Sequence, residues 1–412
     1  MTIGNIVIVG AGQAGAWVAR SLRDGGHTGP VILIGDELHA PYERPPLSKE
    51  ILLGSGTAEE LTLLDHDECA SLDIETRLGT RVEGIDRPAR RLRLSGGEEL
   101  SYDKLVLCTG GHARRLDLPG LDDPRVHTLR TLDDALRLKA ALSETPGHVV
   151  VVGGGWIGLE VAASARSLGC EVTVFESADR LCARSVTPDV SAALQKLHEA
   201  QQVNVLLSTQ LSTVTPTEDG FSLTLSSGKR LDCRHIIVAA GLVANDALAR
   251  DAGLTCANGI VVDTQCRTSD PDIHAAGDVA ILETSLPGTR LRLESWQNAQ
   301  DQGMAVAQAI LGRDVSYRPV PMVWSQQYDR FIQIAGHVNA GTLVAERPAG
   351  VDGSLRFYLA DDTTVLGAIG MNAGRDFRFA RQLVERSCRI APDVLTDTTR
   401  PLNKLATATV SA

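Results

Sequence analysis

The chain has 412 residues, of which 43% are hydrophobic and 22% are charged, and it carries a formal net charge of −11 at pH 7. This length predicts two or three domains, and the composition is that of an ordinary water-soluble globular protein. The negative charge argues against a nucleic-acid partner, because phosphate binding needs a basic surface. No stretch reaches the roughly 18 apolar residues of a membrane span, so we expect no membrane contact.

The first element is a short β-branched run, residues 5–9, which is typical of a buried parallel strand. It leads into a turn of the form G-x-G-x-x-G and then into a predicted helix over 16–22. Gly10 permits the tight turn, Gly12 lets the backbone approach a pyrophosphate, and Gly15 lets the helix pack closely on the strand. The free N–H groups at the helix start would then hold the phosphates of a dinucleotide.

An acidic residue follows this turn at the distance expected of a ribose-binding carboxylate. The apolar strand 31–34 ends in Gly35-Asp36, and Asp36 lies 21 residues beyond Gly15. An acid at the end of the second strand accepts hydrogen bonds from an adenosine ribose. The alternative is a strand–turn–helix that binds nothing, which this context disfavours.

The same pattern recurs in the middle of the chain, where strand 148–152 leads into a second glycine turn and a predicted helix over 159–168. The residues of this turn that we expect to contact a nucleotide are Gly153, Gly155, Ile157 and Gly158. A further strand, 171–175, ends in Glu176, whose carboxylate repels a 2′-phosphate and so favours NADH over NADPH. Arg180, four residues later, is the one feature that would suit NADPH.

Two more buried strands end in glycine turns, at Thr109-Gly110-Gly111 and at Ala239-Ala240-Gly241, and each closes a dinucleotide-binding domain. The second domain is therefore predicted to lie inside the first. We expect an α/β protein with one dinucleotide domain over 1–112 and 241–322, another over 113–240, and a C-terminal domain over 323–412. Two dinucleotides in one chain indicate hydride transfer from one cofactor to the other.

The cysteines show neither C-x-x-C pairs nor zinc-like spacing, so we expect no metal site and eight reduced, mostly buried thiols. They are Cys69, Cys108, Cys170, Cys182, Cys233, Cys256, Cys266 and Cys388. Because none precedes Cys69, no redox-active pair follows the first glycine turn, and electrons must leave to an external partner. The first basic residue is Arg20, which argues against a signal peptide, and we expect a cytoplasmic protein.

The segment that contains Gly277-Asp278 resembles the G-D motif of two-dinucleotide flavoprotein reductases. Nearly the whole chain resembles the ferredoxin reductases of bacterial aromatic-ring dioxygenase systems. The motifs that carry this resemblance are PYERPPLSK at 41–49, ESWQNA at 294–299 and WSQQY at 324–328. Segments 244–246 and 257–263 are especially similar to the phenylpropionate or cinnamate dioxygenase reductase. Biphenyl-type reductases belong to the same group, and relatives that serve cytochromes P450 or rubredoxin share most of these motifs.

The resemblance implies FAD as the tightly held cofactor and NADH as the electron donor. It places Arg44 and Lys49 at the isoalloxazine ring, with the Lys49 amine near N5. The other FAD contacts that it implies are Ala14, Asp36, Val82, Thr109, Arg130, Asp278 and Trp296. Glu160 would pair with Lys49 and orient the nicotinamide, while Glu176 and Arg184 would contact the NAD ribose and its neighbours. Lys49 and Glu160 are therefore the catalytic candidates.

Each of these assignments has a plainer alternative. Lys49 and Arg44 lie in a proline-rich loop that neither a helix nor a strand explains, although both could be solvated charges. Glu160 could be an ordinary acid in the first turn of a helix, stabilised by the helix dipole. Trp324 could pack in the core or form a wall of the cofactor site, and the Cys108 thiol is expected to serve packing only.

The implied fold is glutathione-reductase-like without the redox disulfide, followed by a C-terminal α+β domain. The implied function is to take hydride from NADH onto FAD and to pass single electrons to a 2Fe–2S ferredoxin, of the Rieske type, that feeds an aromatic-ring dioxygenase. A reductase for a P450 ferredoxin or rubredoxin is the alternative within enzymes. A flavin-bearing signalling protein is the alternative of another class, and the negative charge disfavours it. We expect a monomer or a homodimer.

A helix-like stretch near Asn372 is rich in arginine and is a candidate docking patch for an acidic ferredoxin. Its arginines are Arg375, Arg378, Arg381, Arg386 and Arg389. A solvated helix face is an equal alternative. A second arginine group lies in a predicted β-hairpin, where we favour ordinary solvated charges: Arg87, Arg90, Arg91 and Arg93.

Overall fold

The computed structural model describes residues 4–408, and within it the chain forms two compact units. Unit 1 consists of the residues up to Arg44 together with Glu59–His112 and Val243–Pro321. Unit 2 consists of Pro45–Ala58, Ala113–Leu242 and the residues from Met322 onward. The short strands β8 (Gly111–Ala113) and β17 (Leu242–Ala244) carry two of the crossings of the chain between the units.

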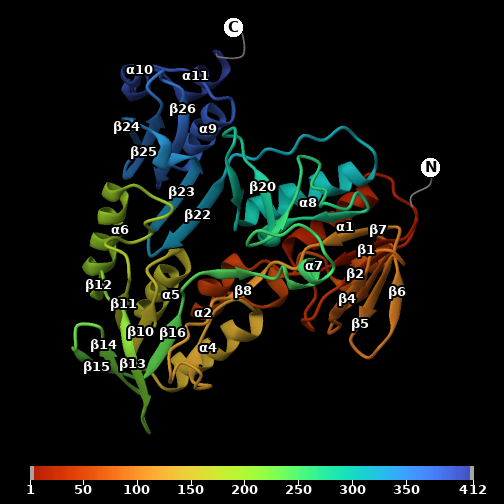
Figure 1. Ribbon diagram of the computed structural model, residues 1–412. Coiled ribbons are helices and arrows are strands. Elements are labelled where there is room, and N and C mark those ends of the chain that lie inside the picture. The colour runs from red at the N-terminus through yellow and green to blue at the C-terminus, as the bar shows by residue number, and fades with distance from the viewer. Residues whose placement is uncertain (1–3, 409–412) are drawn as a thin grey trace. The chain divides into compact units, whose positions relative to one another are not determined.

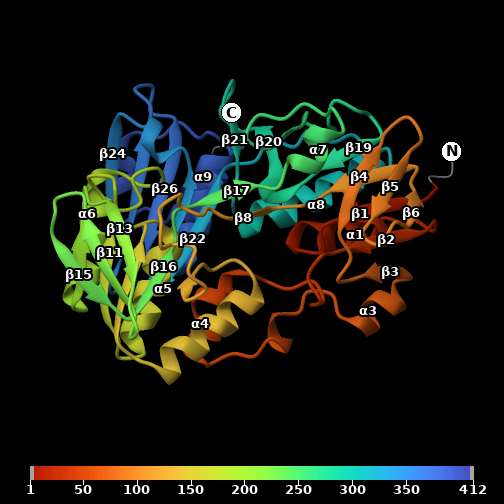
Figure 2. The ribbon, with the colours of Figure 1, turned by 60° about the horizontal axis from the view of Figure 1, so that its bottom comes forward.

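Unit 1 is built on a parallel sheet with the strand order β19-β7-β1-β2-β3. Its strands are β1 (Ile6–Val9), β2 (Val31–Ile34), β3 (Ile74–Arg77), β7 (Lys104–Leu107) and β19 (Ile273–Ala275). Ile6 and Ile8 face one apolar core, and Val7 and Val9 face another. Helices α1 (Gln13–Asp24) and α8 (Trp296–Ile310) pack side by side over the first core (Figure 2). Burial on both faces explains why β1 and β2 are continuous apolar runs.

The described residues of unit 1 also form two small sheets and four short helical segments. The sheets contain β4 (Val82–Asp86), β5 (Arg91–Leu94) and β6 (Glu99–Ser101), and β18 (Ile260–Val261), β20 (Ala280–Glu283) and β21 (Arg290–Arg292). The helical segments are α3 (His66–Ser71), α7 (Ala247–Asp251), and the 3₁₀ turns η2 (Glu59–Leu61) and η3 (Gly277–Val279). Each arginine of the β4–β5 hairpin forms an ion pair with a neighbouring carboxylate, which supports its interpretation as a set of ordinary surface charges.

Unit 2 repeats the parallel sheet with the order β12-β11-β10-β16-β9. Its strands are β9 (Val126–His127), β10 (His148–Val152), β11 (Glu171–Phe175), β12 (Val203–Leu206) and β16 (His235–Val238). Its main helices are α4 (Leu132–Glu144), α5 (Trp156–Ser167) and α6 (Pro188–Ala200). An antiparallel sheet adds β13 (Leu211–Pro216), β14 (Phe221–Leu225) and β15 (Arg230–Cys233), and the segment from Pro45 adds η1 (Pro45–Ser48) and α2 (Glu50–Leu53).

The C-terminal part of unit 2 is an antiparallel sheet with the order β22-β23-β26-β25-β24. Its strands are β22 (Met322–Gln327), β23 (Arg330–Gly336), β24 (Leu343–Ala349), β25 (Gly353–Leu359) and β26 (Val365–Met371). The turn η4 (Val338–Ala340) and helices α9 (Gly374–Glu385), α10 (Pro392–Thr396) and α11 (Leu402–Ala408) complete it. This sheet lies beside α6 (Figure 1), where the Tyr358 hydroxyl is 2.9 Å from Thr187 Oγ1.

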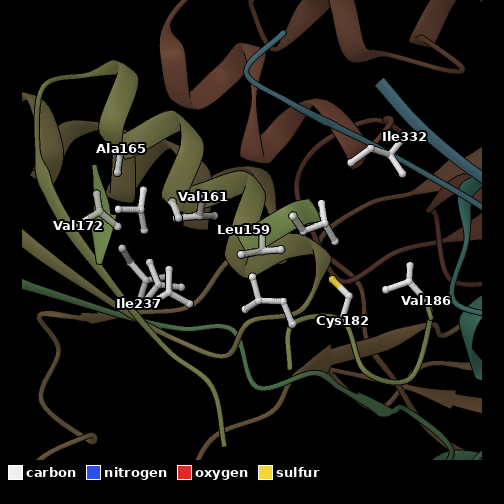
Figure 3. Packing of buried hydrophobic residues seen from close by; sticks show 14 of the residues in the cluster. Leu159, Val161, Ala165, Val172, Cys182, Val186, Ile237 and Ile332 are labelled. Carbon is white, nitrogen blue, oxygen red and sulfur yellow. The ribbon is translucent and has the colours of Figure 1, made fainter. Parts of the chain in front are cut away.

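One apolar core joins the parallel sheet of unit 2 to its C-terminal sheet. Figure 3 shows Leu159 and Val161 of α5 among these residues, with Val172 of β11 and Ile237 of β16. Ile332 of β23 belongs to the same cluster, so α5 packs between the two sheets. The C-terminal segment therefore helps to hold the helix that follows the second glycine turn.

The structure differs from the sequence-based expectations at three places. Both helices after the glycine turns begin earlier than predicted, at Gln13 and Trp156, because the last residues of each turn already have helical geometry. Glu160 is consequently the fifth residue of α5 and not part of its first turn. The proline-rich loop contains the 3₁₀ helix η1, since proline suits the first turn of a helix. Pro45–Ala58 packs with unit 2, although its position in the chain groups it with 1–112.

Candidate dinucleotide sites and a buried ion pair

The first glycine turn combines two tight backbone contacts with one open position. A Cβ on Gly10 would lie 2.1 Å from the Cys108 carbonyl oxygen, and one on Gly15 would lie 2.0 Å from the Gly10 carbonyl oxygen. A Cβ on Gly12 would meet no atom within 4 Å. Helix α1 starts at this point, and no side chain caps it. Uncapped N–H groups at an open helix start fit the pyrophosphate of a dinucleotide such as FAD.

The second turn reproduces this geometry in unit 2. A Cβ on Gly153 would lie 2.4 Å from the Ala239 carbonyl oxygen, and one on Gly158 would lie 2.0 Å from the Gly153 carbonyl oxygen. Gly155 has no atom within 4 Å of such a Cβ, and no side chain caps α5. The second turn therefore fits a dinucleotide on the same physical grounds as the first.

The acids that follow the two turns differ in their surroundings. Asp36 is exposed at the end of β2. Glu176 is half-buried, and its carboxylate accepts hydrogen bonds from the N–H groups of Gly154 at 2.7 Å and Ala178 at 2.8 Å. These bonds fix the second acid beside its glycine turn. Arg180 donates to the carbonyl oxygens of Val186 at 2.6 Å and Ala183 at 2.7 Å, so its guanidinium shapes the loop after β11.

Several other residues implied for the NAD site gather in unit 2. The Arg184 guanidinium lies 3.7 Å from the position of a Cβ on Gly241. Burial raises the pKa of the Cys182 thiol, and the nearby carboxylates of Glu176 and Glu160 raise it further. Both acids are therefore close enough to this thiol to disfavour its ionised form. Ile157, the second residue of α5, is 46% exposed.

In unit 1, Arg44 and Asp278 are close enough to interact electrostatically. Arg44 donates to Glu37 at 2.7 Å, and Tyr42 donates to the other oxygen of that carboxylate at 2.6 Å. Burial alone would lower the pKa of Arg44, but Tyr42, Glu37 and Asp278 together raise it. Trp296 begins α8 and donates its indole N–H to Glu43 at 3.2 Å. The motifs around 41–44, 278 and 296 therefore converge on one region of unit 1.

The remaining implied FAD residues lie in different environments. Ala14 is buried in α1, and Val82 is buried at the start of β4. The Thr109 hydroxyl donates to the Asn245 carbonyl oxygen at 2.8 Å, beside Gly110, and the Asn245 amide donates back to the Thr109 carbonyl oxygen at 2.9 Å. Arg130 lies in unit 2, where its backbone N–H donates to Asp134 at the start of α4. Their contacts with FAD stay predictions.

Lys49 and Glu160 form a buried ion pair within unit 2. Lys49 precedes α2, and its Nζ lies 2.7 Å from Oε2 of Glu160 in α5. Only 8% of Lys49 and 4% of Glu160 is exposed. Ser48 donates its hydroxyl to the same carboxylate oxygen at 2.5 Å, and the Lys49 ammonium lies 5.3 Å from the ring centroid of Trp324. Both charges of this pair are shielded from water. A buried pair of this kind is a candidate for orienting a substrate.

Three residues that were not among the predicted site residues are hydrogen-bonded to this pair, directly or through one another. Ser325 in β22 donates to Oε1 of Glu160 at 2.7 Å. Gln327 donates to Ser325, and His198 is hydrogen-bonded to Gln327. Ser325 and Gln327 occur in the WSQQY motif, which points to the segment but not to its contacts. His198 has no neighbouring signal in the sequence, because its role depends on the packing of α6.

All eight cysteines are free, and burial raises the pKa of Cys108 to about 12. Among residues 4–408, no helix is long and apolar enough to cross a membrane. Two parallel-sheet folds, each with a dinucleotide turn, and no disulfide near the first turn define a two-nucleotide α/β oxidoreductase. The chain belongs to the pyridine nucleotide-disulphide oxidoreductase family, whose model matches residues 4–303, and a reductase C-terminal model matches residues 322–406.

Curated relatives and solved structures agree with this assignment. The chain is 38% identical over 400 residues to the anthranilate 1,2-dioxygenase system ferredoxin–NAD(+) reductase component of Burkholderia cepacia, covering 97% of this chain and 98% of the relative. It is 37% identical to the 3-phenylpropionate/cinnamic acid dioxygenase ferredoxin–NAD(+) reductase component of Photorhabdus laumondii, covering 94% and 98%. Putidaredoxin reductase in its covalent complex with putidaredoxin matches at 34% identity and a TM-score of 0.94, covering 99% of each chain. The predicted fold class and the resemblance to dioxygenase ferredoxin reductases are confirmed.

Proposed function

We propose that this chain is an FAD-dependent NADH:ferredoxin oxidoreductase that supplies electrons to an aromatic-ring dioxygenase. The observation that carries the proposal is the pair of open, uncapped glycine turns, one in each unit, in a chain whose cysteines are all free. FAD supplies the chemistry, because a flavin accepts two electrons together as hydride and releases them singly. The net reaction converts NADH and two oxidised ferredoxins into NAD⁺, a proton and two reduced ferredoxins.

Unit 1 is the proposed FAD-binding unit. The backbone around Gly12 and the start of α1 hold the pyrophosphate, and Asp36 accepts hydrogen bonds from the adenosine ribose. Arg44 and Asp278 bind further along the cofactor. The bonds of Arg44 to Glu37 and Tyr42 support this role, because they hold the guanidinium in one orientation.

Unit 2 is the proposed NADH-binding unit. Gly155 and the start of α5 hold the pyrophosphate of NADH, and Glu176 binds the adenosine ribose. The carboxylate of Glu176 repels a 2′-phosphate, and Arg180 is already bonded to carbonyl oxygens of its own loop, so NADH is preferred over NADPH. Glu160, held by Lys49, orients the nicotinamide. Catalysis is then mainly a matter of positioning, which accounts for the absence of an acid–base dyad in this scheme.

The proposed electron acceptor is a 2Fe–2S ferredoxin of the Rieske type, and the proposed compartment is the cytoplasm. Arg375 and Arg378 of α9 are the docking candidates. The other arginines of this stretch are engaged: Arg381 with Glu385, Arg389 with Asp362, and Arg386 with the Ala406 carbonyl oxygen. The eight free thiols support a reducing compartment.

The test is reduction of a purified Rieske-type ferredoxin by the flavoprotein with NADH, compared with NADPH. We expect ferredoxin reduction well above the rate at which the reduced flavoprotein loses electrons to oxygen, and slower turnover with NADPH. Turnover that stays at the oxygen-leak rate with every ferredoxin would overturn the assignment.

A second candidate is a reductase for another small electron carrier, such as a P450 ferredoxin or rubredoxin. The match to putidaredoxin reductase supports it, because that reductase was solved in a covalent complex with putidaredoxin and aligns with this protein over 99% of each chain. Parallel assays with the three carriers discriminate between the candidates: the preferred acceptor has the highest kcat/KM.

A further inference from the structure

A chain of buried hydrogen bonds runs from Glu160 through strand β22 into helix α6. Ser325 Oγ lies 2.7 Å from Oε1 of Glu160, and Gln327 Nε2 lies 3.0 Å from Ser325 Oγ. Gln327 Oε1 lies 2.9 Å from Nε2 of His198, and Nδ1 of His198 lies 3.4 Å from the Tyr328 hydroxyl. We call Ser325, Gln327, His198 and Tyr328 the Glu160 hydrogen-bond chain. All of its members lie in unit 2.

The side chains in the middle of the Glu160 hydrogen-bond chain are fully buried. Ser325 and His198 are 0% exposed and Gln327 is 1% exposed. Ser325 and Gln327 alternate along β22 and so share its buried face, whereas Ile332 and Ile334 fill the buried positions of the neighbouring strand β23. Buried polar groups cost stability unless every one is hydrogen-bonded, and an apolar face would pack there without that cost. A polar face at this place therefore indicates a role other than stability.

The hydrogen bonds have a single consistent direction. The Glu160 carboxylate accepts from Ser325, whose oxygen then accepts from the Gln327 amide nitrogen. The Gln327 carbonyl oxygen faces Nε2 of His198, which must carry a proton. Burial lowers the pKa of His198, so the ring is neutral and its Nδ1 accepts from the Tyr328 hydroxyl. Every donor in the Glu160 hydrogen-bond chain therefore points toward Glu160.

A carboxylate fixed at both oxygens cannot rotate about its last bond. Rotation about the final torsion of a glutamate side chain is otherwise broad, so one bonded oxygen does not define its plane. Lys49 and Ser48 hold Oε2, and the Glu160 hydrogen-bond chain holds Oε1. We propose that Ser325, Gln327 and His198 are positioning residues that set the Glu160 carboxylate for the nicotinamide of NADH. This inference rests on the proposed function, in which Glu160 orients that ring.

The test compares two replacements of His198 with a matched control. His198→Leu removes the donor to Gln327, while His198→Gln keeps an N–H donor. His235→Leu is the control, because His235 is also buried and its Nε2 lies 2.7 Å from the Thr145 carbonyl oxygen, away from Glu160. The measurements are NAD⁺ affinity of the oxidised flavoprotein by calorimetry, the rate of flavin reduction by NADH, and the apparent unfolding temperature.

We expect His198→Leu to weaken NAD⁺ binding and to slow flavin reduction by about tenfold, because small misplacements of a positioning group have large effects on rate. His198→Gln and His235→Leu should both stay within about twofold of wild type. Delivery of electrons from the dithionite-reduced protein to ferredoxin should not change in any variant. A loss in His198→Leu no larger than in His235→Leu would overturn the positioning role.

Ser325→Ala is a second test of the positioning role, because it removes the hydrogen bond to Glu160 itself. If the chain acts in series, adding His198→Leu to Ser325→Ala costs little more than Ser325→Ala alone. Full additivity of the two effects would overturn the inference. The proposed function fails separately: it is overturned if NADH does not reduce the wild-type flavin.

Discussion

Gly12 and Gly155 occupy equivalent places in the two turns, and each leaves the space of a missing side chain free of protein atoms. Their neighbours Gly10 and Gly153 are different, since a Cβ on either would collide with a carbonyl oxygen. Both open glycines have extended backbone geometry that any residue can adopt. Gly10 and Gly153 are therefore required by the fold, whereas Gly12 and Gly155 leave space for a ligand.

Valine at either open position should remove one ligand and leave the other. Gly155→Val should keep FAD but weaken NAD⁺ binding by roughly 100-fold or more, because the side chain occupies the place of the pyrophosphate. Gly12→Val should lose FAD and retain the folded sheet of unit 2. Flavin absorbance of the purified protein and NAD⁺ calorimetry measure the two outcomes. Loss of FAD from Gly155→Val with NAD⁺ binding intact would contradict the assignment of the units.

His274 makes stability depend on pH. It is 2% exposed in β19, and burial, aided by the positive charge of Lys104, lowers its pKa from 6.5 to about 4. Between these values the unfolded chain binds a proton that the folded chain does not, so stability falls as the pH decreases from 6.5 toward 4. The effect of this residue amounts to about 2 to 3 kcal/mol over two pH units.

His274→Leu should therefore reduce the loss of apparent unfolding temperature between pH 7 and pH 4.5. Replacement of the exposed His66 by leucine is the control for the loss of a histidine that lies outside the core, and it should change that loss less than His274→Leu does. An identical loss in wild type and His274→Leu would show that other groups account for the acid sensitivity.

At the scale of elements, local patterns predicted the strands and the glycine turns, because each depends on residues that are neighbours in the chain. The helix starts were predicted three residues late, since a G-x-G-x-x-G turn already contains the first turn of its helix. The surroundings of Glu160 could not be predicted from local pattern. Ser48 is 112 positions away in the chain and Ser325 is 165 positions away, so only tertiary packing brings them together. The Lys49–Glu160 pair was expected through family resemblance alone.

One buried arginine is hydrogen-bonded to the end of α10 and to the segment that leads into α11. Arg347 of β24 is 5% exposed, and it donates to the carbonyl oxygens of Asp397 at 2.8 Å and Arg400 at 2.9 Å and to that of Leu395 at 3.2 Å. Arg347→Met should cost about 3 kcal/mol, because it leaves these carbonyl groups without their donor. Hydrogen exchange should rise within 392–408. NAD⁺ affinity should not change, and a tenfold loss of that affinity would contradict a purely local role.

At the scale of the whole molecule, a net charge of −11 opposes the approach of an acidic ferredoxin. Association then requires a local surface of opposite sign. Arg375 and Arg378 are exposed on α9, and no ion pair is found for either of them within residues 4–408. Arg91 and Arg93 are also exposed, but each is paired with a glutamate. Replacing either pair of arginines changes the net charge by the same amount, so the two replacements separate the effect of position from the effect of total charge.

The double replacement Arg375→Glu/Arg378→Glu should raise the KM for an acidic ferredoxin about five- to tenfold at low salt, because steering depends on the charges near the docking surface. Arg91→Glu/Arg93→Glu changes the net charge by the same amount and should have less than about a twofold effect. Increasing the ionic strength should bring the two variants together, since salt screens surface charges. NADH oxidation with a small uncharged acceptor should be the same in both. Equal effects of the two variants on ferredoxin would show that total charge, and not α9, governs association.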